Sequence, residues 1–316
     1  MPRRSVTESP SRKYLRTLSI AGLSVLVFLC GLPVGTKALA SDFLEHKRGR
    51  ESRALNAPSE MRKLGGLNVA IWRPSQDAAT KRPLLLFSHG FLGCNTQSNF
   101  LMKLFADSGY LVVAPNHKDS LCERGSRGSK PEWSFIQAFA WTPASYKDRR
   151  DDMYRLIDAL HEDAELDSEI DWTRVGLVGH SLGGYTVLGL AGGWPTWKMR
   201  DVKAVLALSP YCHPLAANGD LASIGIPVMY QSGTADSGVA PFVKRPAGCF
   251  AKNSSPAIYV EFKGAGHLAW TDFSKTDHQL IGEYSVAFLD KYVRGGTRDV
   301  ADPSVRKTGV SDLRVK

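Results

Sequence analysis

The chain has 316 residues, 43% of them hydrophobic, and a net charge of +9. That length suits one α/β domain with a sizeable core plus terminal extensions. The charge lies mostly at the two ends. Residues 1–40 hold six basic residues and one acidic residue, and residues 294–316 hold six basic residues and three acidic residues. The body between them is almost neutral, which argues against an electrostatic surface for nucleic acid.

The first 40 residues have the pattern of an export signal. A basic region ends at Arg16, an uncharged and mostly apolar stretch reaches Thr36, and small residues stand at Ala38 and Ala40. We expect cleavage after Ala40 and a secreted or periplasmic protein with no stable membrane span. The alternative is an uncleaved N-terminal membrane anchor, because the uncharged stretch is about long enough to cross a bilayer.

Short apolar runs then alternate with helical patterns, and residues 41–293 are expected to form one domain. The expected strands are Leu67–Trp72, Leu84–Phe87, Leu111–Ala114, Val175–Val178, Val202–Leu208, Val228–Gln231 and Ala257–Phe262. The expected helices are Asn99–Asp107, Asp148–Glu162, Leu182–Ala191 and His278–Val293. This alternation predicts an α/β fold with a mostly parallel sheet and helices on both faces. Residues 41–65 are polar and predict a surface segment, and residues 294–316 predict a loose tail.

The stretch from Gly179 to Gly183 contains Gly-His-Ser-Leu-Gly between a predicted buried strand and a predicted helix. A serine in that context projects its hydroxyl from a sharp, strained turn. The outer glycines avoid collisions with neighbouring backbone, and the helix N-terminus offers N–H groups to an oxyanion. The pattern predicts acyl transfer with Ser181 as the nucleophile. The alternative is a glycine-rich turn without catalysis.

A serine nucleophile needs a base, and the base needs a carboxylate to orient it. His267 lies in a glycine-rich loop after the last predicted strand, and Asp236 lies just beyond the strand Val228–Gln231. The resulting chain order is serine, acid, histidine, as in α/β-hydrolases. The rival acids are Asp220 and Asp272, neither of which directly follows a strand, and the rival base is His278, which lies within a helix.

The oxyanion hole requires two backbone N–H donors. Leu182, directly after the nucleophile, and Phe91, in the loop after the strand Leu84–Phe87, are the candidates. We expect structural roles for His180 and His89. The aromatic segment 122–147 is interpreted as a lid or a pocket wall, or alternatively as core packing on the sheet. The candidate pocket residues are His117, Trp133, Phe135, Phe139 and Trp141.

These motifs resemble the α/β-hydrolase superfamily, and within it the platelet-activating-factor acetylhydrolase-like and dienelactone-hydrolase-like serine esterases. The resemblance is carried by Phe87–Phe91, Ala114–Ser120, the Ser181 turn, Gly233–Asp236 and Gly266–His267. Dienelactone hydrolases use a cysteine nucleophile, where this chain has a serine. Secreted polyester hydrolases share the same general layout.

Four cysteines remain once Cys30 leaves with the signal. An even number in an oxidising compartment suggests two disulfides, and four free thiols are the alternative. In the fold that the resemblance implies, neighbouring strands favour the pairs Cys94–Cys122 and Cys212–Cys249. None of the four has metal-ligand spacing, so we expect no zinc site. We expect no other metal and no cofactor.

These observations together predict a secreted serine hydrolase that cleaves carboxylic esters through an acyl-serine intermediate. Its expected partner is a small ester substrate, with a short acyl chain or derived from a lipid, and not a nucleic acid. One alternative is a serine peptidase, amidase or polyester hydrolase on the same fold. Another is a binding module without catalysis, since fold alone does not settle function. No oligomeric state is predicted.

Overall fold

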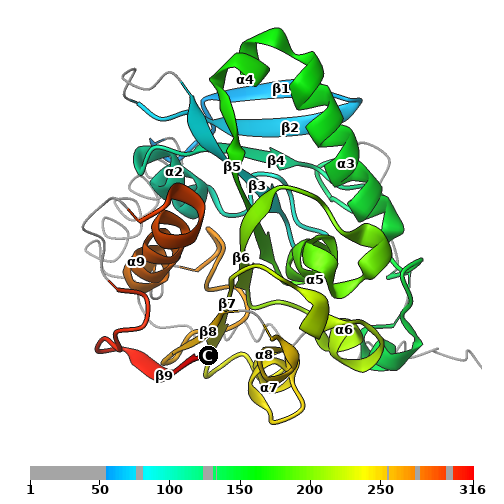
Figure 1. Cartoon of the computed structure of the whole chain (residues 1–316), viewed down its shortest axis with the longest axis vertical. Coiled ribbons are helices and arrows are strands. Elements are labelled where there is room, and N and C mark those ends of the chain that lie inside the picture. The colour runs from blue at the N-terminus through cyan, green and yellow to red at the C-terminus, as the bar shows by residue number, and fades with distance from the viewer. Residues whose placement is uncertain are drawn as a thin grey trace, which may run out of the picture. The chain divides into compact units, whose positions relative to one another are not determined.

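The structure is a computed structural model that describes residues 55–75, 81–123, 131–132, 134–254, 256–274, 278–296 and 302–316. Within these residues a nine-stranded sheet has the order β1-β2-β4-β3-β5-β6-β7-β8-β9 (Figure 1). The strands from β4 to β8 in that order run parallel, whereas β1, β2 and β9 pair antiparallel. Their bounds are β1 Glu60–Leu64, β2 Leu67–Trp72, β3 Arg82–Ser88, β4 Leu111–Pro115, β5 Ile170–His180, β6 Val202–Leu208, β7 Val228–Gly233, β8 Ala257–Phe262 and β9 Val310–Val315. The expected signal segment, residues 1–40, lies outside the described residues.

Helices cover both faces of this sheet. The α-helices are α2 Asn99–Asp107, α3 Lys147–Glu162, α4 Ala164–Glu169, α5 Leu182–Leu188, α6 His213–Asn218, α7 Ala240–Lys244, α8 Cys249–Lys252 and α9 His278–Leu289. Short 3-10 turns are η1 Phe135–Ala140, η3 Pro195–Trp197 and η4 Leu221–Ser223, and π turns are η2 Gly189–Gly193 and η5 Asp290–Arg294. Helices α2 and α9 lie on one face, and α3 and α5 lie on the other (Figure 1).

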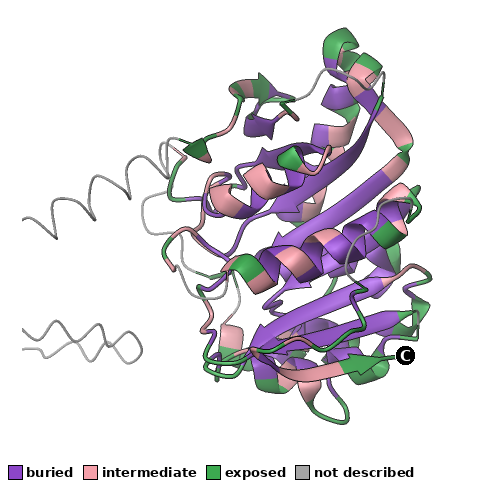
Figure 2. Cartoon of the chain, turned by 90° about the vertical axis from the view of Figure 1, so that its left-hand side faces the viewer, coloured by how far each residue is buried: buried purple, intermediate pink, exposed green. Residues whose placement is uncertain are grey.

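The core forms two apolar layers, one on each side of the sheet. Side chains alternate between the two faces of a strand. In β3, Leu84 and Leu86 join the layer under α3 and α5, whereas Leu85 and Phe87 join the layer under α2 and α9. The central strands are therefore buried along almost their whole length (Figure 2). The fold is the predicted α/β class with a mostly parallel sheet.

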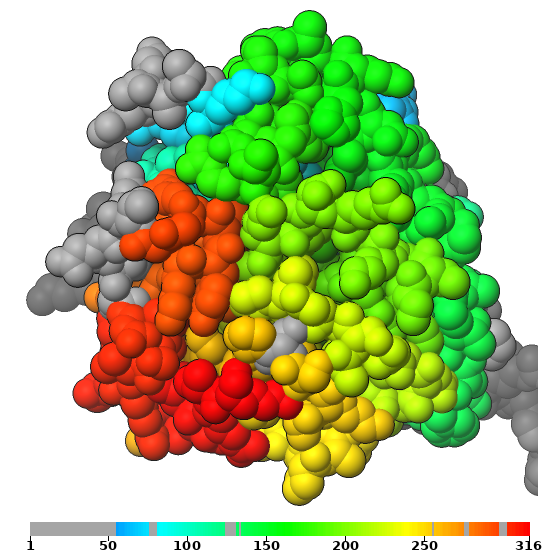
Figure 3. Space-filling model, viewed as in Figure 1, coloured from blue at the N-terminus to red at the C-terminus, as the bar shows by residue number. Residues whose placement is uncertain are grey.

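Two edge strands differ from the sequence expectation. β1 lies in the segment expected to be an irregular surface region, and β9 lies in the segment expected to be a loose tail. β9 pairs with β8, and the C-terminal segment packs beside the segments that carry α7 and α8 (Figure 3). Much of each strand is accessible to solvent, and both sequences are accordingly polar. Neither strand therefore has the continuous apolar run of a central strand.

Both disulfides have the expected pairing. Cys94 pairs with Cys122, with Cα atoms 5.7 Å apart, and Cys212 pairs with Cys249, with Cα atoms 6.3 Å apart. The first joins the loop after β3 to the loop after β4, and the second joins the loop after β6 to the start of α8. Across the described part of the chain, every helix is too short or too polar to cross a bilayer.

Candidate active site

Three side chains from separate loops meet at the carboxyl ends of the parallel strands. Ser181 follows β5, Asp236 follows β7 and His267 follows β8. The Ser181 Oγ atom lies 2.9 Å from His267 Nε2, and His267 Nδ1 lies 3.0 Å from Asp236 Oδ2. Parallel strands end along one edge of a sheet, which brings residues that are distant in sequence together. The structure thus places side by side the three residues that the sequence pattern selected.

The turn that carries Ser181 is sharp and strained. Ser181 has φ +55° and ψ −116°, a backbone conformation that a residue with a side chain rarely adopts. A Cβ on Gly179 would lie 2.2 Å from the Gly183 carbonyl oxygen, and one on Gly183 would lie 1.9 Å from the Ser88 carbonyl oxygen. Only glycine fits at either position, so these two residues allow the close turn that exposes the Ser181 hydroxyl.

Ser209 joins this group and was missed by the sequence reasoning. It follows β6, is fully buried, and has φ +41°. Its hydroxyl donates a hydrogen bond to Asp236 Oδ2, and its Oγ atom lies 3.0 Å from His267 Nδ1. The only signal available in the sequence was its place at the end of a predicted strand next to the one that precedes Asp236.

The electrostatics around Asp236 favour a charged carboxylate. Burial by itself raises the pKa of this carboxyl, but the hydrogen bond and charge of His267 and the hydroxyl of Ser209 outweigh it. The resulting pKa lies below the ordinary value. A carboxylate on Nδ1 keeps the proton of His267 on that nitrogen, which leaves Nε2 free to accept a proton from Ser181.

The loop after β3 lies directly beside the Ser181 turn. A Cβ placed on Gly90 would lie 3.4 Å from Ser181 Cβ. Phe91, the candidate donor, follows Gly90 in this loop. Leu182 is the first residue of α5, where the helix leaves backbone N–H groups without an internal partner. The residues that carry the two candidate oxyanion donors therefore lie next to the Ser181 turn and come from separate elements.

A hydrogen-bonded chain connects the three loops of the site. The Gly90 N–H donates to Gln97 Oε1 at 3.0 Å, and Gln97 Nε2 lies 3.0 Å from His180 Nδ1. His180 Nε2 then donates to the carbonyl oxygen of His267 at 2.9 Å. Burial lowers the pKa of His180 to about 3, so the ring stays neutral. His180 has the expected structural place, and Gln97 is a second residue that the sequence reasoning missed.

The expected pocket residues separate into different environments. Phe135 packs edge-on against Phe91 at 5.2 Å and against Tyr211 at 5.0 Å, measured between ring centroids. Tyr211 itself donates its backbone N–H to the Ser181 carbonyl at 2.9 Å. Phe135 therefore packs on two residues that adjoin the Ser181 turn, whereas Phe139, also in η1, is 69% exposed.

The expectation of a pocket role for Trp141 and His117 is corrected by their burial. Both side chains are fully buried, so neither can contact a bound ester in this structure. Trp141 packs among Tyr146, Tyr185 and Tyr211. His117 has ring nitrogens 2.9 Å from Ser88 Oγ and 3.1 Å from Asp152 Oδ2. Trp133, the remaining candidate, lies outside the described residues.

The rival residues have structural contacts elsewhere in the fold. Asp220 accepts a hydrogen bond from the backbone of Ser223 at the start of η4. Asp272 accepts hydrogen bonds from the first backbone N–H groups of α2, and His278 stacks on Phe100 with ring centroids 3.5 Å apart. Among the residues that the structure describes, no cluster of three or more histidine, cysteine or acidic side chains could hold a metal ion.

A parallel sheet between two helical layers, with a serine on the turn from β5 to α5, defines an α/β-hydrolase fold. The chain belongs to the PET hydrolase-like family, whose family model matches residues 40–301.

Individual relatives are similar to the chain at low identity. Cutinase 2 of Thermobifida cellulosilytica is 26% identical over 215 residues, which cover 67% of this chain and 68% of the cutinase. Cutinase cut1 of Thermobifida fusca is also 26% identical over 215 residues, which cover 67% of this chain and 56% of that protein. A platelet-activating factor acetylhydrolase of Gallus gallus is 20% identical over 253 residues, which cover 68% of this chain and 57% of that protein. The match spans little more than half of these last two proteins. The relatives indicate a carboxylic ester hydrolase.

Proposed function

We propose that this protein is a secreted serine esterase in which Ser181, His267 and Asp236 form the catalytic triad. The single observation that carries the proposal is the hydrogen-bonded row from the Ser181 hydroxyl through both His267 nitrogens to the Asp236 carboxylate. The strained turn under Ser181 and its place at the end of β5 support the same assignment. The export pattern of residues 1–40 supports secretion.

In this proposal His267 Nε2 takes the proton of Ser181 as Oγ attacks the ester carbonyl carbon. The negative charge that forms on the carbonyl oxygen is stabilised by the backbone N–H groups of Phe91 and Leu182. His267 then donates that proton to the leaving alkoxide, which leaves an acyl-serine. Water, deprotonated by the same nitrogen, attacks the acyl carbon, and the Ser181 oxygen recovers its proton. Asp236 stabilises the charged imidazolium in both halves.

Ester cleavage is tested by removing the nucleophile. Ser181→Ala should lower the hydrolysis of p-nitrophenyl butyrate by at least about 10³-fold, because no other oxygen replaces the attacking atom. Ser168→Ala, on the exposed surface of α4, is the control and should retain wild-type activity. A fluorophosphonate should label the wild type and not Ser181→Ala. Full activity in the Ser181 variant would refute the assignment, and a wild type with neither hydrolysis nor label would favour the binding module.

Polyester is the second candidate substrate, favoured by the relatives named cutinase and by the PET hydrolase-like family model. An exposed apolar side chain beside the site supports an apolar partner, since Leu268 directly follows His267 and is 52% exposed. Wild-type protein incubated with poly(ethylene terephthalate) film should release soluble acid, and Ser181→Ala should not. Activity confined to short-acyl phospholipids would favour the acetylhydrolase-like reaction. Faster cleavage of amino-acid p-nitroanilides than of esters would favour the peptidase.

A further inference from the structure

We propose that Arg149 is a positioning residue of the oxyanion hole. Its guanidinium holds the carbonyl oxygens of His89 and Gly90 and so orients and polarises the N–H of Phe91. This inference rests on the proposed function, in which that N–H stabilises the transition state. Arg149 would touch neither the substrate nor the reacting atoms.

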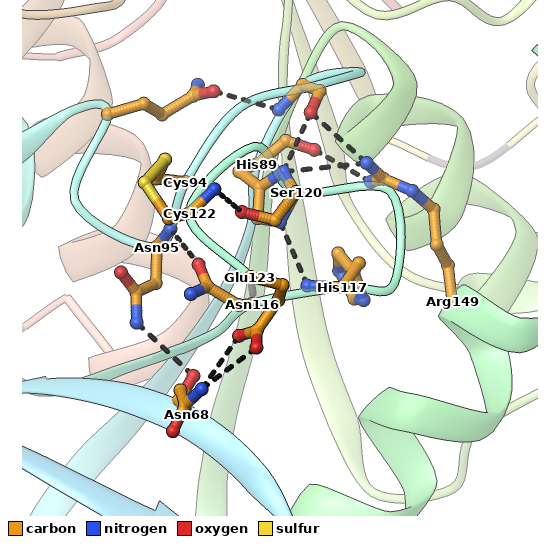
Figure 4. The surroundings of a disulfide bond; sticks show 12 residues. Asn68, His89, Cys94, Asn95, Asn116, His117, Ser120, Cys122, Glu123 and Arg149 are labelled. Carbon is orange, nitrogen blue, oxygen red and sulfur yellow. Dashed lines mark hydrogen bonds between the residues drawn. A yellow bond between two sulfur atoms is a disulfide. The ribbon is translucent and has the colours of Figure 1, made fainter. Parts of the chain in front are cut away.

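Arg149 lies in the first turn of α3, and its side chain has no solvent exposure. Its Nη1 atom donates to the His89 carbonyl at 2.7 Å, and its Nη2 atom donates to the Gly90 carbonyl at 3.1 Å. Figure 4 shows the side chain reaching from the helix to the backbone beside His89. It is unusual for a fully buried arginine to donate hydrogen bonds to two successive carbonyl groups. Burying its charge is unfavourable unless the charge is paired.

Asp119 pairs that charge and holds the same loop from its other end. Its two carboxylate oxygens accept from Arg149 Nε at 3.0 Å and from Arg149 Nη2 at 2.7 Å. One of them also accepts from the backbone N–H of Leu92 at 3.3 Å. Leu92 has φ +57°, so the loop adopts a strained conformation that these contacts must stabilise. Together Arg149 and Asp119 fix the residues on both sides of Phe91.

The geometry of one peptide bond transmits this contact to the site. The Gly90 carbonyl and the Phe91 N–H belong to a single planar unit, and in the trans form they point in opposite directions. The Gly90 oxygen accepts hydrogen bonds from Arg149 Nη2, from His89 Nδ1 at 2.7 Å and from the Gly93 N–H at 3.0 Å. Three donors on the oxygen set the orientation of the peptide plane and hence the direction of the Phe91 N–H.

Hydrogen bonds to a carbonyl also polarise the peptide and make its N–H a stronger donor. A cationic donor does this more than a neutral one. The same contact holds the oxygens of His89 and Gly90 in place, so that neither can rotate toward Ser181 and repel the developing oxyanion. The loop lies close enough for this to matter, because Gly90 abuts Ser181.

Arg150 provides a matched comparison on the same helix. It is the next residue, it is partly exposed, and its Nη1 atom pairs with Asp151 at 2.7 Å. Arg149→Met and Arg150→Met therefore remove the same charge from adjacent positions, and only the first removes the contacts to the loop. Arg149→Lys keeps the charge, but one ammonium group cannot span the carboxylate and both carbonyl oxygens as a guanidinium does.

The experiment compares these variants on p-nitrophenyl butyrate and on a trifluoromethyl ketone, which mimics the tetrahedral transition state. Arg149→Met should lower kcat about 10- to 100-fold with KM changed less than about threefold, since only transition-state stabilisation is lost. Affinity for the ketone should fall by a similar factor, whereas affinity for a non-hydrolysable ether analogue should not change. Arg149→Lys should be intermediate, and Arg150→Met should match the wild type.

A second measurement does not depend on activity. In protein labelled with ¹⁵N-phenylalanine, the amide signal of Phe91 should shift in Arg149→Met and stay in place in Arg150→Met. A folded Arg149→Met with wild-type kcat and ketone affinity, or an unchanged Phe91 signal, would overturn the inference while the wild-type esterase remained active. A wild type without esterase activity would overturn the proposed function, and this inference with it. If Arg149→Met fails to fold, Arg149→Lys provides the test. A wild-type kcat in Arg149→Lys would contradict the positioning role of Arg149.

Discussion

At the residue scale, the turn that exposes Ser181 depends on how closely two segments of backbone approach. Gly183 packs against the backbone of Ser88, and a side chain there would overlap the Ser88 carbonyl oxygen at 1.9 Å. The obstacle is backbone of a central strand, which cannot move aside as a flexible side chain can. The turn could therefore accommodate an added methyl group only if the backbone of this strand moved, which would be strongly destabilising.

We expect Gly183→Ala to lower the free energy of unfolding by more than about 3 kcal/mol, or to abolish soluble expression. Gly225→Ala is the control, because a Cβ there meets open space and its φ is ordinary. That variant should be neutral or slightly stabilising. Urea unfolding of both variants provides the measurement. Equal stability of the two alanine variants would contradict the close approach in the structure.

Ser209 adds a second residue-scale effect, because its hydroxyl contacts both the acid and the base of the proposed triad. Removing it with Ser209→Ala should raise the pKa of Asp236 and loosen the His267 ring, since the carboxylate loses a donor. We expect kcat to fall about three- to tenfold, with a larger loss at acidic pH. A pH profile of kcat on p-nitrophenyl butyrate checks this. A profile that superimposes on the wild type would show that the contact has no catalytic consequence.

At the element scale, β9 covers the edge of the sheet that β8 would otherwise expose. It pairs with β8 from Ile258 to Phe262, and the Ser311 hydroxyl donates to Glu261 at 2.8 Å. An unpaired edge strand is a template for aggregation, so the C-terminal segment protects the sheet. Val310, at one end of β9, is buried in the layer under α9, and Leu313 packs against the same layer partly buried.

Val310 and Val315 allow a matched test of that packing. Val310 is 5% exposed and Val315 is 56% exposed, although both belong to β9. We expect Val310→Ala to cost about 1 to 2 kcal/mol of stability, because buried methyl groups are lost, and Val315→Ala to stay within about 0.5 kcal/mol. Thermal unfolding separates them. If both variants were indistinguishable from the wild type, β9 would not contribute to the core.

The elements that were predicted and those that were missed differ in burial. β3, β4, β6, β7 and β8 are central strands, and their continuous apolar runs are unambiguous in the sequence. β1 and β9 are edge strands with polar sequences, so periodicity could not separate them from loops. The helix predicted over Leu182–Ala191 begins where expected, but its last turn becomes the π turn η2.

At the scale of the whole molecule, the loops that hold the site are tied together by buried, neutral histidines. Burial lowers the pKa of His180 to about 3 and lowers the pKa values of His89 and His117 well below their ordinary value. In the unfolded chain all three titrate near pH 6.5. The unfolded state therefore binds more protons below that pH, and the free energy of unfolding falls as the pH is lowered.

Asp152 opposes this trend. Burial raises its pKa to about 6, so the folded state holds a proton that the unfolded state has lost between about pH 6 and pH 4. The protonated Asp152 carboxyl therefore adds to the free energy of unfolding at low pH, and this stabilisation disappears as the pH rises through 6. The three histidines outnumber this one carboxyl, so the unfolded state still binds more protons than the folded state as the pH falls below about 6.

We therefore expect stability to fall steeply below about pH 6. Urea unfolding from pH 7 to 4.5 measures the slope, and His180→Asn should reduce it by about one proton. His161→Asn is the control, because His161 is half exposed. A flat stability curve across this range would contradict the buried neutral histidines.

The sequence by itself determined the turn at Ser181, the order of serine, acid and histidine, and the buried central strands. These features are local, because a strand, a tight turn and a helix start are encoded by adjacent residues. Only the tertiary structure decided that Ser209 and Gln97 contact the loops of the candidate site and that Arg149 contacts the loop after β3. Arg149 lies four residues before Met153, on the apolar face of α3, which was the one available hint.

A buried polar contact requires partners from distant segments, and no pattern along one segment specifies them. The same reason explains His117, which was a pocket candidate because it follows a strand end, and Trp141, which was one because it lies in an aromatic segment. Packing buries both side chains. Sequence periodicity predicts which face of a helix or strand is apolar. Which faces contact one another depends on the packing of the whole chain. The candidate catalytic residues were therefore predicted from local motifs, whereas the residues that contact them were found only in the assembled fold.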